Sequence, residues 1–166
     1  MAEEQRLTHP FPPLFGPDSE ALILGSFPSV KSREQSFFYG HPQNRFWRVI
    51  AAVFEEDVPS SIEEKTLLIL QNRLALWDSI RSCTITGSSD SSVRDVVPND
   101  ISAILGNSKV DRVFCNGALS YKMYMKYIYP DVRIKAVKLP STSPANAAFS
   151  LDRLIKEWSV LRKDKI

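Results

Sequence analysis

The chain has 166 residues and a formal net charge of +2, with 43% hydrophobic and 24% charged residues. These values are typical of one globular domain with a full core, and the mild charge neither requires nor excludes a nucleic-acid partner. Two cysteines without a CxxC pair, and two histidines, are too few for a zinc finger or an iron–sulfur cluster. We therefore expect no metal and no cofactor. The first residues lack a signal-peptide core and no apolar run approaches the ~20 residues of a membrane span, which predicts a cytoplasmic protein without membrane contact.

The predicted elements begin after a proline-rich segment. Residues 1–19 are expected to form an irregular surface arm, and residues 20–166 to form a single domain. Residues 21–24 (ALIL) are a short apolar run that ends at Gly25, which indicates a buried strand of a parallel sheet. A polar loop is expected at residues 31–36, and the apolar spacing of residues 43–55 predicts the first helix.

The rest of the chain continues this alternation of strands and helices. The capping-box pattern SIEE at residues 61–64 predicts a second helix, and residues 74–77 (LALW) predict a second strand that ends in Asp78. Residues 82–98 are expected to be a loop around a serine-rich centre. The further expected elements are a short helix between 98 and 106, a strand at 112–115, a helix at 119–129, an edge strand at 134–139 and a helix at 151–161. The pattern predicts an α/β fold, a three-layer α/β/α domain with a central, mostly parallel four-stranded sheet.

Ligands of such sheets gather at the carboxyl ends of the strands. Each predicted strand ends in a small or polar cluster: Gly25-Ser26, Asp78-Ser79, Asn116-Gly117 and Ser141-Thr142-Ser143. The sequence contains neither a Ser/His/Asp set for hydrolysis nor a GxxxxGK[ST] or GxGxxG phosphate loop. Serines, asparagines and aromatic residues at one edge suit the recognition of a planar ring that forms hydrogen bonds.

The first of these clusters, Gly25-Ser26, is followed by an unusual stretch, FFYGHPQNRFW at residues 37–47. Pro42 disfavours helix at the residue before it, which places Asn44 close to a helix start. There the side-chain amide of Asn44 either caps the helix or faces a ligand.

The chain resembles the uracil-DNA glycosylase superfamily, and its hypoxanthine-DNA glycosylase branch most closely. Three motifs carry the resemblance: GSFPS at 25–29 is similar to the first family motif, residues 37–47 to the aromatic-then-NRFW stretch, and STSPAN at 141–146 to the final HPSP motif. The sequence departs from the family twice. Phe27 stands where the first motif carries a water-activating Asp or Asn, and Ser141 stands where the last motif carries His.

The resemblance implies a monofunctional DNA glycosylase that flips a deaminated base, with hypoxanthine as the first expectation, and hydrolyses its N-glycosidic bond. The same loss of the acid marks the hypoxanthine branch, in which an asparagine at the position of Asn44 takes over, so Asn44 is the expected catalytic residue. Its carbonyl is expected to orient the water. The expected base-binding residues are Phe27, Phe38, Tyr39 and Asn116. The expected DNA-binding residues are Ser26, Ser29, Arg45, Ser141, Ser143, Ala145 and Asn146, with Lys31 and Arg33 beside them and Asp90 as a further candidate near the site.

Each of these residues also has a structural interpretation. Asn44 suits a helix cap, Asn116 a turn before Gly117, the serines ordinary turns, and at least one of Phe37, Phe38 and Tyr39 the core. Two alternative functions stay open: a uracil or thymine mismatch-specific glycosylase, and an inactive module that binds damaged bases. The expected partner is double- or single-stranded DNA with a deaminated base, bound by a monomer.

Overall fold

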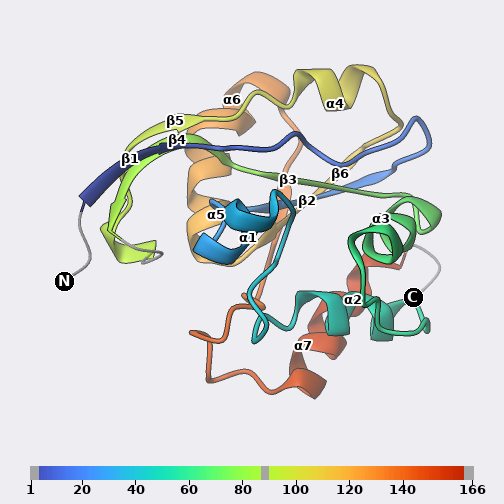
Figure 1. Ribbon diagram of the computed structural model, residues 1–166. Coiled ribbons are helices and arrows are strands. Elements are labelled where there is room, and N and C mark those ends of the chain that lie inside the picture. The colour runs from blue at the N-terminus through green and yellow to red at the C-terminus, as the bar shows by residue number, and fades with distance from the viewer. Residues whose placement is uncertain (1–3, 87–89, 163–166) are drawn as a thin grey trace.

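A four-stranded parallel sheet forms the centre of the computed structural model, which describes residues 4–86 and 90–162 without the side chain of Asp90 (Figure 1). The strand order is β3-β2-β6-β7. The strands are β2 (Ala21–Gly25), β3 (Leu74–Asp78), β6 (Arg112–Asn116) and β7 (Ala136–Leu139). β2 and β3 are buried along their whole length, as continuous apolar runs predict. The predicted α/β fold with a parallel four-stranded sheet is confirmed, and β7 lies at an edge, as its alternating pattern indicates.

Helices cover both faces of this sheet. Figure 1 shows α2 (Phe46–Val53), α3 (Ile62–Gln71) and α7 (Leu151–Trp158) grouped on one side. α7 continues into a 3₁₀ turn, η3 (Ser159–Leu161). The other side carries α5 (Ala118–Met123), a π-helical turn η2 (Tyr124–Ile128) and α6 (Tyr129–Val132), and α4 (Ser102–Gly106) leads into β6. The ring of Phe46 packs edge-on against that of Trp158, with centroids 5.8 Å apart, so α2 and α7 share one core.

A second sheet, which the sequence analysis did not predict, extends from the first. β1 (Glu4–Thr8), β4 (Ile80–Thr86) and β5 (Arg94–Pro98) form an antiparallel sheet in the order β1-β4-β5, and η1 (Asp90–Ser92) lies between β4 and β5. The expected irregular arm is therefore wrong for residues 4–8, and the expected loop at 82–98 is wrong for both strands. The physical reason is a small apolar cluster in which Cys83 and Ile85 of β4 pack with Met123.

The polar loop expected at residues 31–36 is also wrong, because α1 (Val30–Gln35) forms there. The Ser29 hydroxyl caps this helix by accepting a hydrogen bond from the Ser32 N–H at 3.2 Å. The helix ends at Ser36, which adopts the left-handed region with φ 55°. Six mostly polar residues carry no apolar periodicity, so this helix depends on its cap and on packing rather than on a pattern visible in sequence.

The remaining boundaries agree within a few residues. The Ser61 hydroxyl accepts the Glu64 N–H at 3.0 Å, as the capping-box pattern of α3 predicts. The predicted helix at 119–129 is interrupted by η2 and ends in α6, which has a proline in its first turn. Among the described residues, no helix combines the length and apolar character that crossing a bilayer requires.

Both cysteines are free and buried, on β4 and β6 respectively. Burial raises the pKa of Cys115 to about 12 and also raises the pKa of Cys83. At pH 8 very little of Cys115 is then present as the thiolate, the form that attacks electrophiles. We expect Ellman's reagent to leave the native protein unmodified over minutes and to titrate two thiols after unfolding in guanidinium. Rapid release of chromophore from the native protein would contradict this prediction.

Candidate functional site

A cavity of about 690 Å³ opens at the carboxyl ends of the parallel strands. Its volume lies in the range of small-molecule sites, about 300–1,000 Å³. Of the twelve expected site residues, all but Arg45 and Asn146 line it: Ser26, Phe27, Ser29, Phe38, Tyr39, Asn44, Asn116, Ser141, Ser143 and Ala145. The ends of β2, β6 and β7 thus meet the aromatic stretch 37–47 in one place.

The polar centre of this cavity is Thr142, which is fully buried. The amide of Asn116 holds it twice: Oδ1 accepts the Thr142 N–H, and Nδ2 donates to Oγ1, both at 3.0 Å. The Thr142 hydroxyl then donates to Oδ1 of Asn44 at 2.8 Å. One chain of hydrogen bonds therefore joins the end of β6, the loop after β7 and the start of α2.

This network fixes the orientation of Asn44. Its Oδ1 also accepts the backbone N–H of Phe46 at 2.9 Å, so both lone pairs of the carbonyl are occupied. The expectation that this carbonyl orients a water does not fit such an arrangement. The Nδ2 of Asn44 has no hydrogen-bond partner among the residues that the structure describes, so the amide nitrogen is the polar atom left for a ligand in the cavity.

Asn116 is oriented by the same network. Its amide oxygen and one amide hydrogen are used on Thr142, where the sequence analysis expected the amide to read a base edge. What this geometry shows directly is that Asn116 anchors the loop after β7 against the end of β6.

Replacing Thr142 by valine tests the network at nearly constant shape. The hydroxyl is lost, and Nδ2 of Asn116 is left without its buried acceptor, so we expect the free energy of unfolding to fall by about 1–3 kcal/mol. Urea denaturation measures the change. Thr142→Ser retains the hydroxyl and should lose clearly less; equal stability of the two variants would contradict the structural importance of the network.

Arg45 does not face the cavity. Its guanidinium donates to three backbone carbonyls of the loop before α7: those of Ser143 at 2.9 Å, Asn146 at 3.0 Å and Phe149. Its own backbone N–H donates to the Thr142 carbonyl at 3.0 Å. The structure therefore uses Arg45 to anchor this loop, in contrast to the phosphate contact expected from sequence, because both terminal nitrogens of the guanidinium already donate to backbone carbonyls. Its Nε is buried and makes no hydrogen bond with the described residues.

The loop at 141–146 is further shaped by its own side chains. The Ser141 hydroxyl accepts the Ser143 N–H at 3.1 Å, and the Ser143 hydroxyl accepts the Ala145 N–H at 3.2 Å. Nδ2 of Asn146 donates to the Ser141 carbonyl at 3.0 Å. These bonds turn the loop so that Pro144 and Ala145 are exposed at its tip, beside the cavity.

The three aromatic residues expected at the base differ in exposure. Phe38 is 3% exposed and belongs to the core, although one part of it lines the cavity. Tyr39 stacks on Phe46 at 3.9 Å between ring centroids, and burial raises the pKa of its phenol well above the usual value, with the negative charge of Asp78 acting in the same direction. Phe27 is partly exposed, with the guanidinium of Arg33 5.9 Å from its ring centroid.

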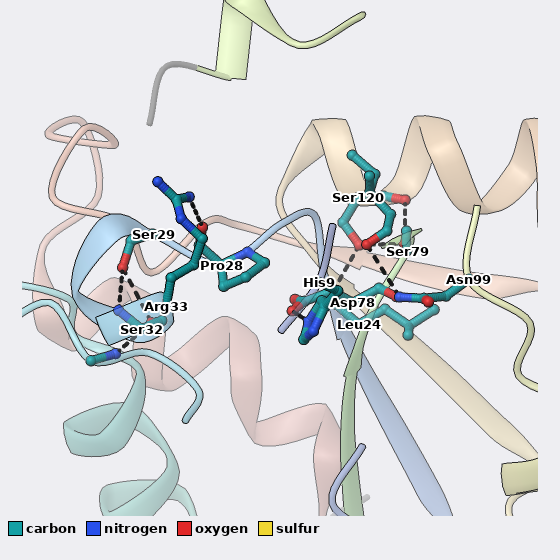
Figure 2. Close-up of polar contacts among 12 residues, drawn as sticks. His9, Leu24, Pro28, Ser29, Ser32, Arg33, Asp78, Ser79, Asn99 and Ser120 are labelled. Atoms are coloured by element: carbon teal, nitrogen blue, oxygen red, sulfur yellow. Dashed lines mark hydrogen bonds and ion pairs between the residues drawn. The ribbon is translucent and has the colours of Figure 1, made fainter. Parts of the chain in front are cut away.

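The expected basic residues beside the site are partly engaged elsewhere. Arg33 donates to the Pro28 carbonyl at 2.8 Å, as Figure 2 shows. Lys31 lines the cavity and forms an exposed ion pair with Glu34 at 3.4 Å. The side chain of Asp90, the further acidic candidate, lies outside the described part of the chain. Within that part, no three His, Cys, Asp or Glu side chains gather in a way that could hold a metal ion.

Three residues at or beside the cavity were assigned no individual role from the sequence: Thr142, Asp78 and His9. Thr142 and Asp78 were visible as polar residues at strand ends, which is the signal that could have found them. Asp78 lines the cavity and is 4% exposed, and His9 contacts it from the N-terminal segment (Figure 2). Nothing in the sequence around His9 indicates this contact, because it joins residues 69 positions apart.

Comparison with known proteins gives a consistent result. Residues 12–162 match the family model described as the uracil DNA glycosylase superfamily. The chain is 34% identical over 155 residues to a protein of Methanosarcina acetivorans named hypoxanthine DNA glycosylase, covering 91% of this chain and 95% of that protein. It is 33% identical over 95 residues to a protein of the same name from Methanosarcina barkeri, covering 57% and 60% respectively. A solution NMR structure of a candidate uracil DNA glycosylase from M. acetivorans superimposes with a TM-score of 0.78 at 32% identity, covering 92% of this chain and 94% of that one.

Proposed function

Because the chain belongs to the uracil DNA glycosylase superfamily, we propose that it is a DNA glycosylase that hydrolyses the N-glycosidic bond of a deaminated base, with hypoxanthine as the preferred base. The observation that carries the choice of base is the similarity, over nearly the whole chain, to a protein named hypoxanthine DNA glycosylase. The substrate is DNA, in double- or single-stranded form, and the protein acts as a monomer. Two free, buried thiols are in keeping with the reducing cytoplasm as its location.

The cavity supports this proposal by its position and lining. An enzyme that acts on a base first moves it out of the stack into a pocket. The aromatic residues Phe27, Phe38 and Tyr39 line such a space. Stacking of a base on an aromatic side chain is worth about 1–3 kcal/mol, enough to offset part of the cost of unstacking.

The chemical step is a displacement by water. The water oxygen bonds to C1′ of the sugar, the bond from C1′ to the base breaks, and its electron pair leaves with the base, which gains a proton from the water. The sugar passes through an oxocarbenium-like state, so the position of the water decides the rate. We assign this positioning to Asn44, through donation from its Nδ2 to the water oxygen, since Oδ1 is held by Thr142 and Phe46.

The loop at 141–146 is the proposed DNA-binding element. Ser26, Ser29, Ser141 and Ser143 line the cavity, and we assign their hydroxyl groups to the phosphates of the flipped nucleotide. Ala145, exposed at the loop tip, would enter the minor groove and fill the vacated stack. In this proposal Arg45 and Asn146 shape the loop and do not touch DNA.

One observation favours a second candidate, a module that binds damaged bases without cleaving them. Phe27 offers neither an acid nor a hydrogen bond at the position where the family's first motif activates water, and the Asn44 carbonyl is already occupied. A uracil or thymine mismatch-specific activity is the other alternative within the same family.

A cleavage assay distinguishes these functions. Labelled 30-base duplexes with one hypoxanthine, uracil, xanthine or mismatched thymine are incubated with excess protein in EDTA, and abasic sites are then cleaved with alkali. We expect cleavage of the hypoxanthine duplex at the highest rate, with Asn44→Ala as the inactive control. Faster cleavage at uracil or thymine would favour the mismatch enzyme. Binding of the hypoxanthine duplex without cleavage would favour the inactive module.

A further inference from the structure

A buried histidine–aspartate pair borders the cavity through Asp78 and has no part in the mechanism above. Nε2 of His9 is 2.6 Å from Oδ2 of Asp78, and the two side chains are 2% and 6% exposed. His9 directly follows the strand β1, whereas Asp78 ends β3 (Figure 2). The backbone N–H of His9 donates to the Arg81 carbonyl at 2.7 Å, so the second sheet fixes where the imidazole stands.

The imidazole of His9 is enclosed by aromatic rings. Its centroid lies 4.4 Å from that of Trp77, 4.5 Å from that of Phe11 and 6.0 Å from that of Phe27. Nδ1 is buried and makes no hydrogen bond with the described residues. Because a carboxylate only accepts, Nε2 carries the hydrogen in the contact with Asp78. Within the described part of the chain, the one hydrogen bond of this imidazole therefore serves to hold one carboxylate oxygen.

The other oxygen of Asp78 is not held by any residue that the structure describes. Asp78 is a cavity-lining residue, and Oδ1 has no hydrogen-bond partner within the described ranges. Oδ1 lies under Gly25, where a Cβ would collide with it, and the Tyr39 hydroxyl lies 3.1 Å from the place of that Cβ. The glycine at the end of β2 thus leaves the space that the carboxylate occupies. A buried carboxylate with one oxygen held and the other oxygen unpaired can accept a hydrogen bond from a ligand.

We propose that His9 is a positioning residue for base recognition: it holds Asp78 so that Oδ1 accepts the lactam N–H of the flipped base. This inference rests on the proposed function. Deamination turns a ring nitrogen that only accepts into an N–H donor, N1–H in hypoxanthine and N3–H in uracil. A fixed acceptor pairs with that N–H, whereas adenine and cytosine present a lone pair at the same position. Guanine and thymine also carry a lactam N–H, so this contact distinguishes a deaminated base from its parent, hypoxanthine from adenine or uracil from cytosine.

Three substitutions separate this role from a contribution to packing. His9→Leu removes the donor, His9→Gln restores an N–H at the same reach, and Phe11→Leu loosens the same aromatic cluster without touching the pair. We expect His9→Leu to weaken binding of free hypoxanthine, measured by calorimetry, by about 10- to 100-fold, the value of a hydrogen bond to a charged group. Single-turnover excision should fall by a similar factor, while His9→Gln and Phe11→Leu stay within about 3-fold of the wild type.

A fourth variant, Asp78→Asn, reverses the polarity of the recognition. The Nε2–H of His9 keeps the amide oxygen at the place of Oδ2, so the NH₂ group faces the cavity. The ratio of affinities for free hypoxanthine and free adenine should then shift toward adenine by at least about 10-fold.

Each result bears on the proposal. The proposal is overturned if His9→Leu binds hypoxanthine as tightly as the wild type does. It is also overturned if His9→Leu and Phe11→Leu lose affinity for hypoxanthine to the same extent, or if Asp78→Asn keeps the base preference of the wild type. If the wild type binds hypoxanthine in the expected pattern but cleaves no duplex, the proposed enzymatic function fails and the recognition role stands. If it instead releases uracil, the same comparison is made with uracil against cytosine.

Discussion

Replacing Asn44 by alanine should lower the single-turnover rate of base excision by about 100- to 10,000-fold, the usual contribution of a positioned catalytic group. The variant loses the Nδ2 that we assign to the attacking water. It also loses the Oδ1 that accepts from Phe46 and Thr142. That second loss resembles the loss of a helix cap and should lower the free energy of unfolding by about 0.5–2 kcal/mol.

Measuring both quantities on the same protein decides between the two roles of Asn44. Gln43→Ala is the matched control, because Gln43 is exposed in the neighbouring position and does not line the cavity. A normal excision rate together with a lowered melting temperature would leave Asn44 as a structural residue. In that case a backbone-held water or Asp90 becomes the next candidate.

Replacing Arg45 by alanine should have the largest effect on stability. The guanidinium satisfies the carbonyls of Ser143, Asn146 and Phe149, and hydrogen bonds to a charged group are worth about 1.5–3 kcal/mol each. Because such losses are not additive, we expect the free energy of unfolding to fall by about 3–5 kcal/mol. Arg45→Lys should recover little, since one ammonium lacks the planar fork that reaches three carbonyls.

The salt dependence of DNA binding separates this anchoring role from a phosphate contact. Each neutralised phosphate contributes about 0.9 to the slope of log affinity against log salt concentration. If Arg45 anchors the loop, Arg45→Lys weakens DNA binding but keeps the slope. A slope reduced by about one in Arg45→Ala and restored in Arg45→Lys would assign Arg45 to a phosphate instead.

The central sheet was predictable because its signals are local. The runs ALIL, LALW and RVFC are short, continuous and bounded by polar residues, so each indicates a buried strand without help from the rest of the chain. The same boundaries predicted that Asn116, Ser141 and Ser143 lie near one another, and they line one cavity.

The second sheet was not predictable in this way. Strand β4 reads IRSCTIT, and its serine, arginine and threonines resemble the loop that follows it. Its partner β1 lies 74 to 82 residues earlier, with Thr8 opposite Ser82 and Glu4 opposite Thr86. The pairing is favoured by the burial of Cys83 and Ile85 against Met123, which lies on α5, beyond β6 in the sequence.

The roles of site residues were harder to predict than their positions. Asn44, Asn116 and Arg45 were all expected to reach outward to the substrate, yet each makes hydrogen bonds inside the protein. A motif shows which residue types meet, whereas the direction of an amide depends on neighbours such as Thr142, which is distant in sequence. His9 escaped notice for the same reason.

The pairing of β1 with β4 has a consequence for how the cavity is completed during folding. Side chains of a strand alternate between its two faces, so a slip of one residue between β1 and β4 would carry the imidazole of His9 to the opposite face. The position of Asp78 at the cavity therefore depends on the register of β1, the edge strand of the antiparallel sheet. During synthesis on the ribosome, residue 9 emerges long before its partner at residue 78, and it must wait unpaired until β4 is available. When the unfolded chain is diluted from denaturant, helical content should therefore return first and excision activity last.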